Sequence, residues 1–221
     1  MSMPSSASET KDDYFENHQH GTRWPFTIYH HPIEASLGQH VAAAAAASKA
    51  KAEILVFGCG MFHEASLFPR NTNVTLVDAD DRLVPFLNKP SNDIVKDIVI
   101  ATSAAELDAK LKGPFDLIIA KEVIEHILDA PQYLALFQKK LRSQGVLWLS
   151  TPNYGDWPLP ILEQSFLEFV AYLKGFSRKH IHPNKYSEKK LTNELSAAGF
   201  TNIHVKKTPI RLALIASCRK P

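Results

Sequence analysis

Glu122, Glu125 and His126 are the residue types best suited to proton transfer or metal binding. Their spacing of three and four positions places the three side chains on one face if the stretch is helical. A histidine with an ordinary pKa of about 6.5 can accept a proton from a hydroxyl group. Two carboxylates and an imidazole can instead hold a divalent cation. Alternatively, Glu122 caps the next helix, and Glu125 and His126 pair with each other or with the backbone.

A second candidate site is the turn Gly58-Cys59-Gly60, which follows the apolar run Ile54–Phe57. The run predicts a buried strand, and the glycines allow a sharp turn with positive φ and a close approach of a ligand to the backbone. A second apolar stretch ends in Asp78. A carboxylate at the tip of a neighbouring parallel strand can accept hydrogen bonds from a ribose diol. The arrangement is typical of a nucleoside-binding α/β domain, whereas the glycines alone also fit a tight turn without a ligand.

Alternating apolar and helical stretches position these two sites. The pattern predicts a mostly parallel sheet covered by helices on both faces. The last two strands are separated only by a turn at Pro209, which predicts an antiparallel hairpin at one sheet edge. The expected strands are Ile54–Phe57, Val74–Val77, Ile94–Ala101, Phe115–Ala120, Gly145–Ser150, Asn202–Lys207 and Leu212–Cys218. The expected helical stretches are Ile33–Ala52, Ala65–Phe68, Leu83–Leu87, Ala104–Leu111, Ile124–Leu141 and Lys189–Ala198.

Residues 1–32 are expected to be separate from the main domain at 33–221. They combine a polar, flexible start with an aromatic and histidine-rich stretch from Tyr14 to His31, which would form either a lid over a site or a packing helix. Because Pro32 follows His30-His31, this pair is expected to be extended. A helical insert at about 154–186 would pack on the core, line a substrate pocket, or do both.

Composition narrows the classes of function. The 221 residues carry a net charge of +2, so the strong basic footprint of a nucleic-acid-binding protein is missing and nucleic acid is an unlikely partner. The longest apolar runs fall short of the roughly 18–20 residues that span a bilayer, so no membrane partner is expected. Two isolated cysteines, Cys59 and Cys218, suggest a reducing, cytoplasmic setting.

Four stretches together resemble the class I S-adenosylmethionine-dependent methyltransferases. They are similar above all to the subgroup with ubiquinone-pathway O-methyltransferases and small-RNA 2′-O-methyltransferases. The stretches are ILVFGCG (54–60), VTLVDAD (74–80), GPFDLIIAKEVIEHILDAP (113–131) and LRSQGVLWLSTPN (141–153). The resemblance covers roughly residues 35–218. It implies a Rossmann-like, doubly wound sheet of seven strands and S-adenosylmethionine as cofactor.

The resemblance also implies roles for individual residues. Val56, Phe62 and Ser103 depart from the family, which usually has an acid, a third loop glycine and an adenine-contacting acid there. The implied cofactor-binding residues are Gly58, Gly60, Asp78, Ala79, Ser103, Ala104 and Lys121. The implied ligands of a divalent metal such as Mg²⁺ are Glu122, Glu125, His126 and His182, with His126 alternatively acting as a catalytic base.

The resulting expectation is methyl transfer to a small-molecule acceptor, at a hydroxyl oxygen. One alternative is a nucleic-acid methyltransferase. Another is a non-catalytic binding or scaffold protein that kept the fold and lost the cofactor, and the departures at Val56, Phe62 and Ser103 favour this alternative. A nicotinamide oxidoreductase is disfavoured by the missing third glycine and by the terminal hairpin.

Overall fold

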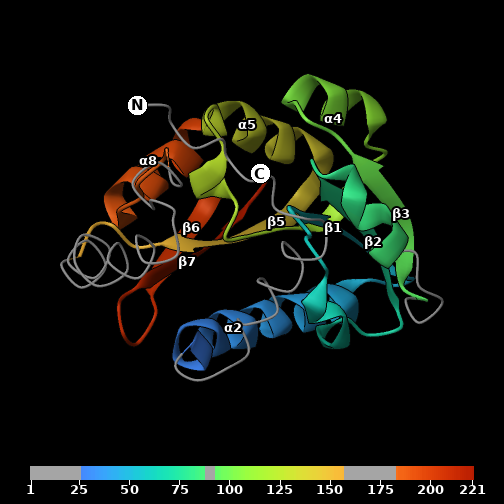
Figure 1. The fold of residues 1–221 in the computed structure, drawn as a ribbon, viewed down its shortest axis with the longest axis horizontal. Helices are drawn as coiled ribbons and strands as arrows, with labels where there is room; N and C mark the ends of the chain where they lie inside the picture. The colour runs from blue at the N-terminus through green and yellow to red at the C-terminus, as the bar shows by residue number, and fades with distance from the viewer. Residues whose placement is uncertain (1–25, 88–92, 157–182) are drawn as a thin grey trace, which may run out of the picture.

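The computed structural model describes residues 26–87, 93–156 and 183–221. Its centre is a seven-stranded sheet in the order β3-β2-β1-β4-β5-β7-β6 (Figure 1). The strands are β1 (Ala52–Phe57), β2 (Thr72–Asp78), β3 (Val95–Ile100), β4 (Phe115–Lys121), β5 (Leu141–Pro152), β6 (Thr201–Lys207) and β7 (Ala213–Arg219). The first five strands pair in parallel, and β7 pairs antiparallel with both β5 and β6. The predicted fold class and its edge hairpin are therefore confirmed.

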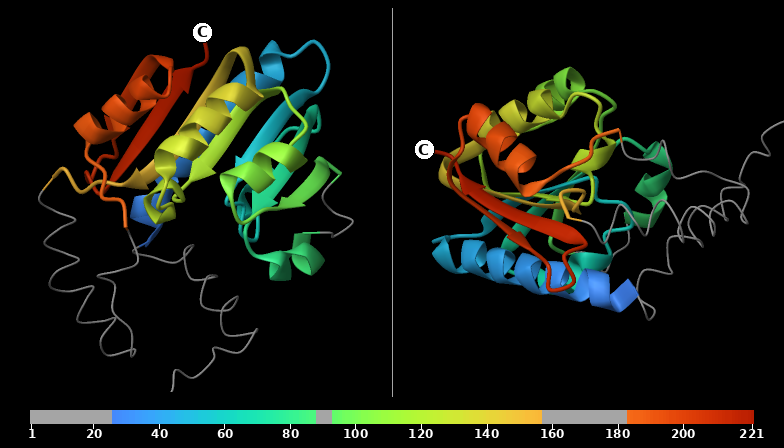
Figure 2. Two further views of the ribbon diagram at one scale, coloured as in Figure 1. Left: turned by 90° about the horizontal axis from the view of Figure 1, so that it is seen from above. Right: turned by 90° about the vertical axis from the view of Figure 1, so that its left-hand side faces the viewer.

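Helices cover both faces of this sheet. The helical segments are α2 (Phe26–Ala47), η2 (His63–Leu67), η3 (Asp81–Leu83), α3 (Val84–Leu87), α4 (Ala104–Lys110), η4 (Ile124–His126), α5 (Ala130–Lys140) and α8 (Glu188–Ala197), the η segments being 3₁₀ turns. Long helix α2 runs across one face, while α4, α5 and α8 lie next to one another over the other face (Figures 1 and 2). Each face has its own buried apolar cluster, so the sheet is covered on both sides as its apolar strands require.

The start of α2 differs from the prediction. The helix begins at Phe26 and ends at Ala47, so it runs through Pro32 and includes the pair His30-His31 that was expected to be extended. The predicted domain boundary after residue 32 therefore falls inside a helix. The physical reason is tertiary packing: Ile33 and Leu37 are fully buried against the sheet, and this burial outweighs the local preference of a residue before proline. The rest of the predicted lid, from Tyr14 to residue 25, lies outside the described residues, as does most of the expected insert.

The predicted helix Ile124–Leu141 is also divided in the structure. Short turn η4 ends at His126, the chain continues extended at Ile127 (φ −89°, ψ 118°), and α5 begins at Ala130 with a proline in its first turn. Proline is compatible with a helix start and unfavourable in a helix interior, so Pro131 marks a new beginning. The division matters because the extended link between the two helices borders a cavity.

Candidate functional site

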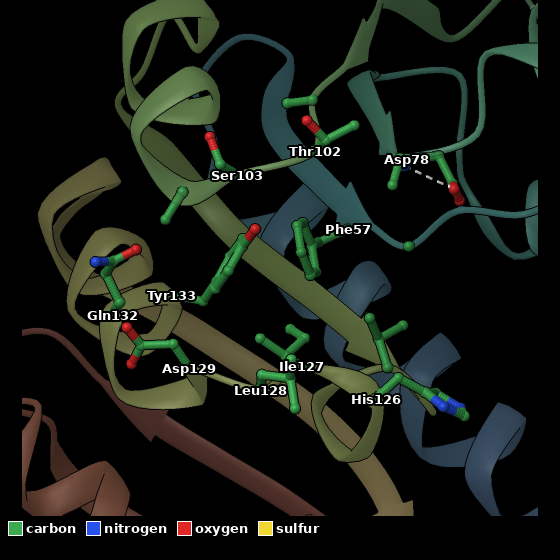
Figure 3. A pocket seen from close by; sticks show the side chains of 15 residues that line it. Phe57, Asp78, Thr102, Ser103, His126, Ile127, Leu128, Asp129, Gln132 and Tyr133 are labelled. Carbon is green, nitrogen blue, oxygen red and sulfur yellow. Dashed lines mark hydrogen bonds between the residues drawn. The ribbon is translucent and has the colours of Figure 1, made fainter. Parts of the chain in front are cut away.

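A cavity of about 490 Å³ lies at the carboxyl ends of the parallel strands, the edge where open α/β sheets place their ligands. The loops after β1, β2, β3 and β4 and the first turns of α5 enclose it (Figure 3). Of the predicted site residues, the cavity brings together Gly58, Asp78, Ala79, Ser103, Ala104 and His126. Gly60 and Lys121 are not among its lining residues. In the sheet, Phe57 at the end of β1 lies beside Val77 of β2 and Ala120 of β4. The three strands therefore end at the same edge of the sheet.

Asp78 connects the two predicted cofactor elements. Its Oδ2 accepts a hydrogen bond from the backbone N–H of Gly60 at 2.9 Å. Its Oδ1 accepts from the backbone N–H groups of Ala79 and Asp80 at 2.8 and 3.1 Å. A carboxylate has about four acceptor positions, so Oδ2 retains one for a further donor. The Asp78 side chain is thus held in place at the cavity and can still bind a ribose hydroxyl.

The two glycines of the loop have different roles. Both have positive φ, 66° at Gly58 and 48° at Gly60. A Cβ atom at Gly58 would lie 2.4 Å from a methyl carbon of Val123, whereas a Cβ at Gly60 would meet no atom within 4 Å. Close packing therefore requires glycine at position 58, and the open space beside Gly60 is where a ligand can approach the backbone.

Phe62 stands where the resemblance leads one to expect a third glycine, and its backbone adopts a conformation that favours glycine. Its φ and ψ are both 50°, which is the left-handed region. This conformation costs a residue with a side chain about 1–2 kcal/mol. The ring is buried and packs edge-on against Phe68, with ring centres 5.2 Å apart. Apolar burial thus holds the turn in the shape that a third glycine would permit without strain.

Ser103 performs a structural task at the cavity. It is the N-cap of α4, and its Oγ accepts a hydrogen bond from the backbone N–H of Glu106 at 3.2 Å. Serine is a favoured residue at this position because it satisfies a free N–H group of the first turn. The hydroxyl group can still donate one hydrogen bond, but its cap role explains the residue without a ligand.

Lys121, predicted to bind cofactor, lies close to two acids in the structure. Its Nζ forms an ion pair with Glu64 of η2 and lies 3.4 Å from Oε1 of Glu34 on α2. Burial alone would lower the pKa of Lys121, but the two acids outweigh it and raise the pKa. Lys121 borders a separate cavity of about 100 Å³ together with Gly58 and Glu64. In the described structure Lys121 therefore connects β4 to the glycine loop and to α2.

Glu122 has an unusual backbone and a partly buried side chain. Its φ is 53°, a conformation that non-glycine residues rarely adopt. The Tyr29 hydroxyl donates to Glu122 Oε2 at 2.5 Å, and the Glu122 N–H donates to the Ser150 carbonyl at 3.1 Å. Within the described ranges, Oε1 is buried without a hydrogen-bond partner. Burial raises the pKa of Glu122.

Glu125 is almost fully buried and faces a different neighbour. Its Oε2 accepts a hydrogen bond from the Thr151 hydroxyl at 3.0 Å. Burial, followed by the nearby charge of Glu122, raises the pKa of Glu125. At neutral pH the two carboxyls therefore resist carrying two negative charges at once.

His126 is the member of the predicted cluster that borders the large cavity. Its side chain is 45% exposed, and Nε2 lies 4.0 Å from Oε1 of Glu125. Across the part of the chain that the structure describes, no three acidic, histidine or cysteine side chains are grouped to hold a metal ion. Glu125 stays near His126, whereas Glu122 turns toward Tyr29, because the left-handed turn at Glu122 and the short η4 replace the expected regular helix. His182 lies outside the described residues.

Three side chains at the cavity and one contact of a residue in the predicted lid escaped the sequence analysis. Asp129, Gln132 and Tyr133 border the cavity from the start of α5. Pro131 was a sequence signal that a new helix begins near residue 130. The first residues of that helix would then follow directly after the loop that carries His126. Tyr29 pairs with Glu122 across 93 positions of the chain, and no local pattern indicates such a contact.

One further finding concerns membranes. Among the described helices, none combines the length and the apolar character needed to cross a bilayer.

Comparisons with known proteins agree with this architecture. The family described as "Methyltransferase domain" matches residues 29–205. A ubiquinone biosynthesis O-methyltransferase of Bartonella quintana is 37% identical over 68 residues, which cover 30% of this chain and 28% of that protein. The match thus spans less than a third of that relative's length.

Solved structures show the same fold at low sequence identity. A SAM-dependent methyltransferase from Archaeoglobus fulgidus superposes with a TM-score of 0.66 at 14% identity, covering 94% of this chain and all of that one. Magnesium protoporphyrin IX methyltransferase from Synechocystis PCC 6803 gives 0.64 at 14% identity, covering 96% and 95%. With most of the chain matched by the family and the fold shared, the expected relationship is confirmed: the chain belongs to the methyltransferase-domain family.

Proposed function

We propose that the protein transfers a methyl group from S-adenosylmethionine to a hydroxyl oxygen of a small-molecule acceptor. The observation that carries the proposal is one cavity bordered by both Asp78, with a free acceptor position, and His126, a candidate base. The cavity, at about 490 Å³, also fits the cofactor in size. Outside its lining, the Cβ side of Gly60 is open as well. The similarity to a ubiquinone biosynthesis O-methyltransferase supports oxygen as the acceptor atom.

When bound, S-adenosylmethionine supplies a methyl group on a positively charged sulfur. An acceptor oxygen bonds to this methyl carbon, and the sulfur leaves on the opposite side as a neutral thioether. Asp78 holds the ribose end, and the backbone at Gly60 supports the cofactor beside it. His126 accepts the proton that the acceptor hydroxyl loses, which raises the nucleophilicity of the oxygen. Val123 and Ile127 form apolar walls between these groups and keep water from the reacting atoms. In this proposal the imidazole takes the proton, while the carboxyls of Glu122 and Glu125 accept hydrogen bonds from Tyr29 and Thr151.

Two measurements test this function. Calorimetry with S-adenosylmethionine and S-adenosylhomocysteine tests cofactor binding, with dissociation constants expected in the micromolar range. Incubation of the protein with methyl-labelled S-adenosylmethionine and a panel of small phenols and catechols tests catalysis, with mass spectrometry of the products. A labelled methyl ether formed together with S-adenosylhomocysteine is the expected result.

The same assays separate the alternatives. Labelling of RNA or DNA, with none of the small molecules labelled, would replace the proposal by nucleic-acid methylation. Binding of neither nucleoside would favour the scaffold protein that kept the fold and lost the cofactor.

A further inference from the structure

The large cavity has two chemically different ends. In Figure 3, Asp78 and His126 lie toward one side, whereas Asp129 and Gln132 lie toward the opposite side. If Asp78 binds the ribose and His126 faces the methyl acceptor, the adenine base must extend toward the end formed by Asp129 and Gln132. This step rests on the proposed function, because it takes the orientation of the cofactor from Asp78.

The exposed side chains of Asp129 and Gln132 at this end make no hydrogen bond to another described residue. Asp129 precedes α5, but its carboxylate makes no cap hydrogen bond with that helix. The Gln132 amide likewise has no hydrogen bond within the described ranges. Ser103, the residue that the family resemblance offered for adenine, already accepts the N–H of Glu106. Asp129 and Gln132 are thus the polar side chains at this end that remain open to a ligand.

The walls beside them are apolar, as a flat base requires. Leu128 borders the cavity with 87% of its surface exposed, so a ring placed against it would remove apolar surface from water. Tyr133 and Phe57 form an aromatic pair with ring centres 5.4 Å apart and also border the cavity. An apolar slot with polar groups at one end matches a purine, which has apolar faces and a polar edge.

We propose that Asp129 and Gln132 recognise the amino edge of the adenine base and set the specificity for an adenine nucleoside. The 6-amino group of adenine donates to the Asp129 carboxylate. The Gln132 amide pairs with the adjoining donor and acceptor of the ring edge, as glutamine and asparagine do with adenine elsewhere. Hypoxanthine carries an oxygen at position 6, so its lone pairs would face the Asp129 carboxylate and weaken binding.

Calorimetry with two nucleosides tests this assignment. The probes are S-adenosylhomocysteine and its 6-oxo analogue S-inosylhomocysteine, measured on the wild type, Asp129→Asn and Gln132→Leu. We expect the wild type to prefer the adenine form by about tenfold or more, which corresponds to about 1.4 kcal/mol. Asp129→Asn should reduce that preference to near unity, because the asparagine amide can donate to the 6-oxo group. Gln132→Leu should also lower the preference, since it removes a polar contact to the base edge.

A control variant outside the cavity shows whether the loss of an acidic side chain alone changes the affinities. Asp97→Asn changes an exposed acid on β3 outside the cavity and should leave both affinities unchanged. An unchanged preference in both Asp129→Asn and Gln132→Leu overturns the inference, as does an equal loss of affinity for both nucleosides. In those cases binding of S-adenosylhomocysteine by the wild type leaves the proposed function standing. If the wild type binds neither nucleoside, the proposed function fails and the inference fails with it.

Discussion

The backbone N–H of Gly60 donates to Oδ2 of Asp78 at 2.9 Å, across 18 positions of the sequence. The glycine loop after β1 and the acid at the tip of β2 are therefore one unit. The other oxygen of Asp78 holds the backbone that follows β2. Because one carboxylate organises both elements, its removal should affect the shape of the site as well as its direct contacts.

Asp78→Ala is expected to weaken binding of S-adenosylhomocysteine by about tenfold or more. The variant loses hydrogen bonds to a charged group, each worth roughly 1.5–3 kcal/mol. The melting temperature should also fall, because the Gly60 N–H loses its acceptor. Calorimetry and thermal unfolding measure the two effects, with Asp97→Ala as a control. Equal affinity of Asp78→Ala and wild type would show that Asp78 does not bind the cofactor.

Gly58→Ala and Gly60→Ala should differ strongly in stability. Both strain a backbone with positive φ, but only the Cβ at position 58 collides with Val123. We expect Gly60→Ala to cost about 1–2 kcal/mol from conformation alone, and Gly58→Ala to cost more. Denaturant unfolding of both variants measures this difference.

The double variant Gly58→Ala/Val123→Ala provides the control. It removes the colliding methyl groups and should recover part of the stability that Gly58→Ala loses. If the two single variants are equally stable, packing against Val123 is not the reason for glycine at position 58.

Glu125→Gln should make the protein more stable at neutral and higher pH. Burial and then Glu122 raise the pKa of Glu125, so between the unfolded and folded pKa values the native state holds more protons than the unfolded state. Stability of the wild type must therefore fall as pH rises through that window, and the uncharged glutamine removes this loss. The gain should be absent below about pH 3, where both states are protonated, and should grow toward about pH 8. Each kcal/mol gained would raise the melting temperature by about 2–4 °C.

Glu53→Gln is a control with the opposite sign. Burial alone would raise the pKa of Glu53, but hydrogen bonds from Asn73 and Lys96 lower it. This carboxylate stabilises the protein above its unfolded pKa, so its replacement should reduce stability at neutral pH and have no effect at low pH. Parallel pH profiles of Glu125→Gln and the wild type would contradict the raised pKa of Glu125.

His126→Ala is expected to lower turnover by about 10²–10⁴-fold if the imidazole takes the acceptor proton. The affinity for S-adenosylhomocysteine should change by less than about twofold, because the cofactor contacts lie elsewhere in the cavity. Rates with an acceptor identified in the labelling assay, together with calorimetry, separate the two effects. Near-normal turnover would remove His126 from the mechanism.

Removal of divalent cations distinguishes the two roles predicted for His126, a catalytic base or a ligand of a metal ion. With the imidazole as the base, enzyme dialysed against a chelator should keep its activity. Loss of activity that Mg²⁺ restores would instead support the ligand set Glu122, Glu125, His126 and His182.

Much of this architecture could be predicted from the sequence because it depends on local patterns. Apolar stretches indicated the seven strands, the first two of which are followed by glycine or aspartate, and their alternation with helices indicated a parallel sheet. Parallel neighbouring strands end at one edge, so the meeting of Gly60 and Asp78 followed from their positions at two strand ends. Both elements are short-range features, and the fold brings their ends together.

Only the tertiary structure decided where the remaining side chains point. Pro32 lies inside α2 because burial of the helix against the sheet outweighs a local preference. Glu122 turns toward Tyr29 in a left-handed conformation, so spacing along the chain did not place it beside His126. Asp129 faces the cavity because the chain is extended after η4. In each case a contact between distant segments, or a single backbone angle, sets the direction of the side chain, and neither is encoded in the periodicity of the sequence.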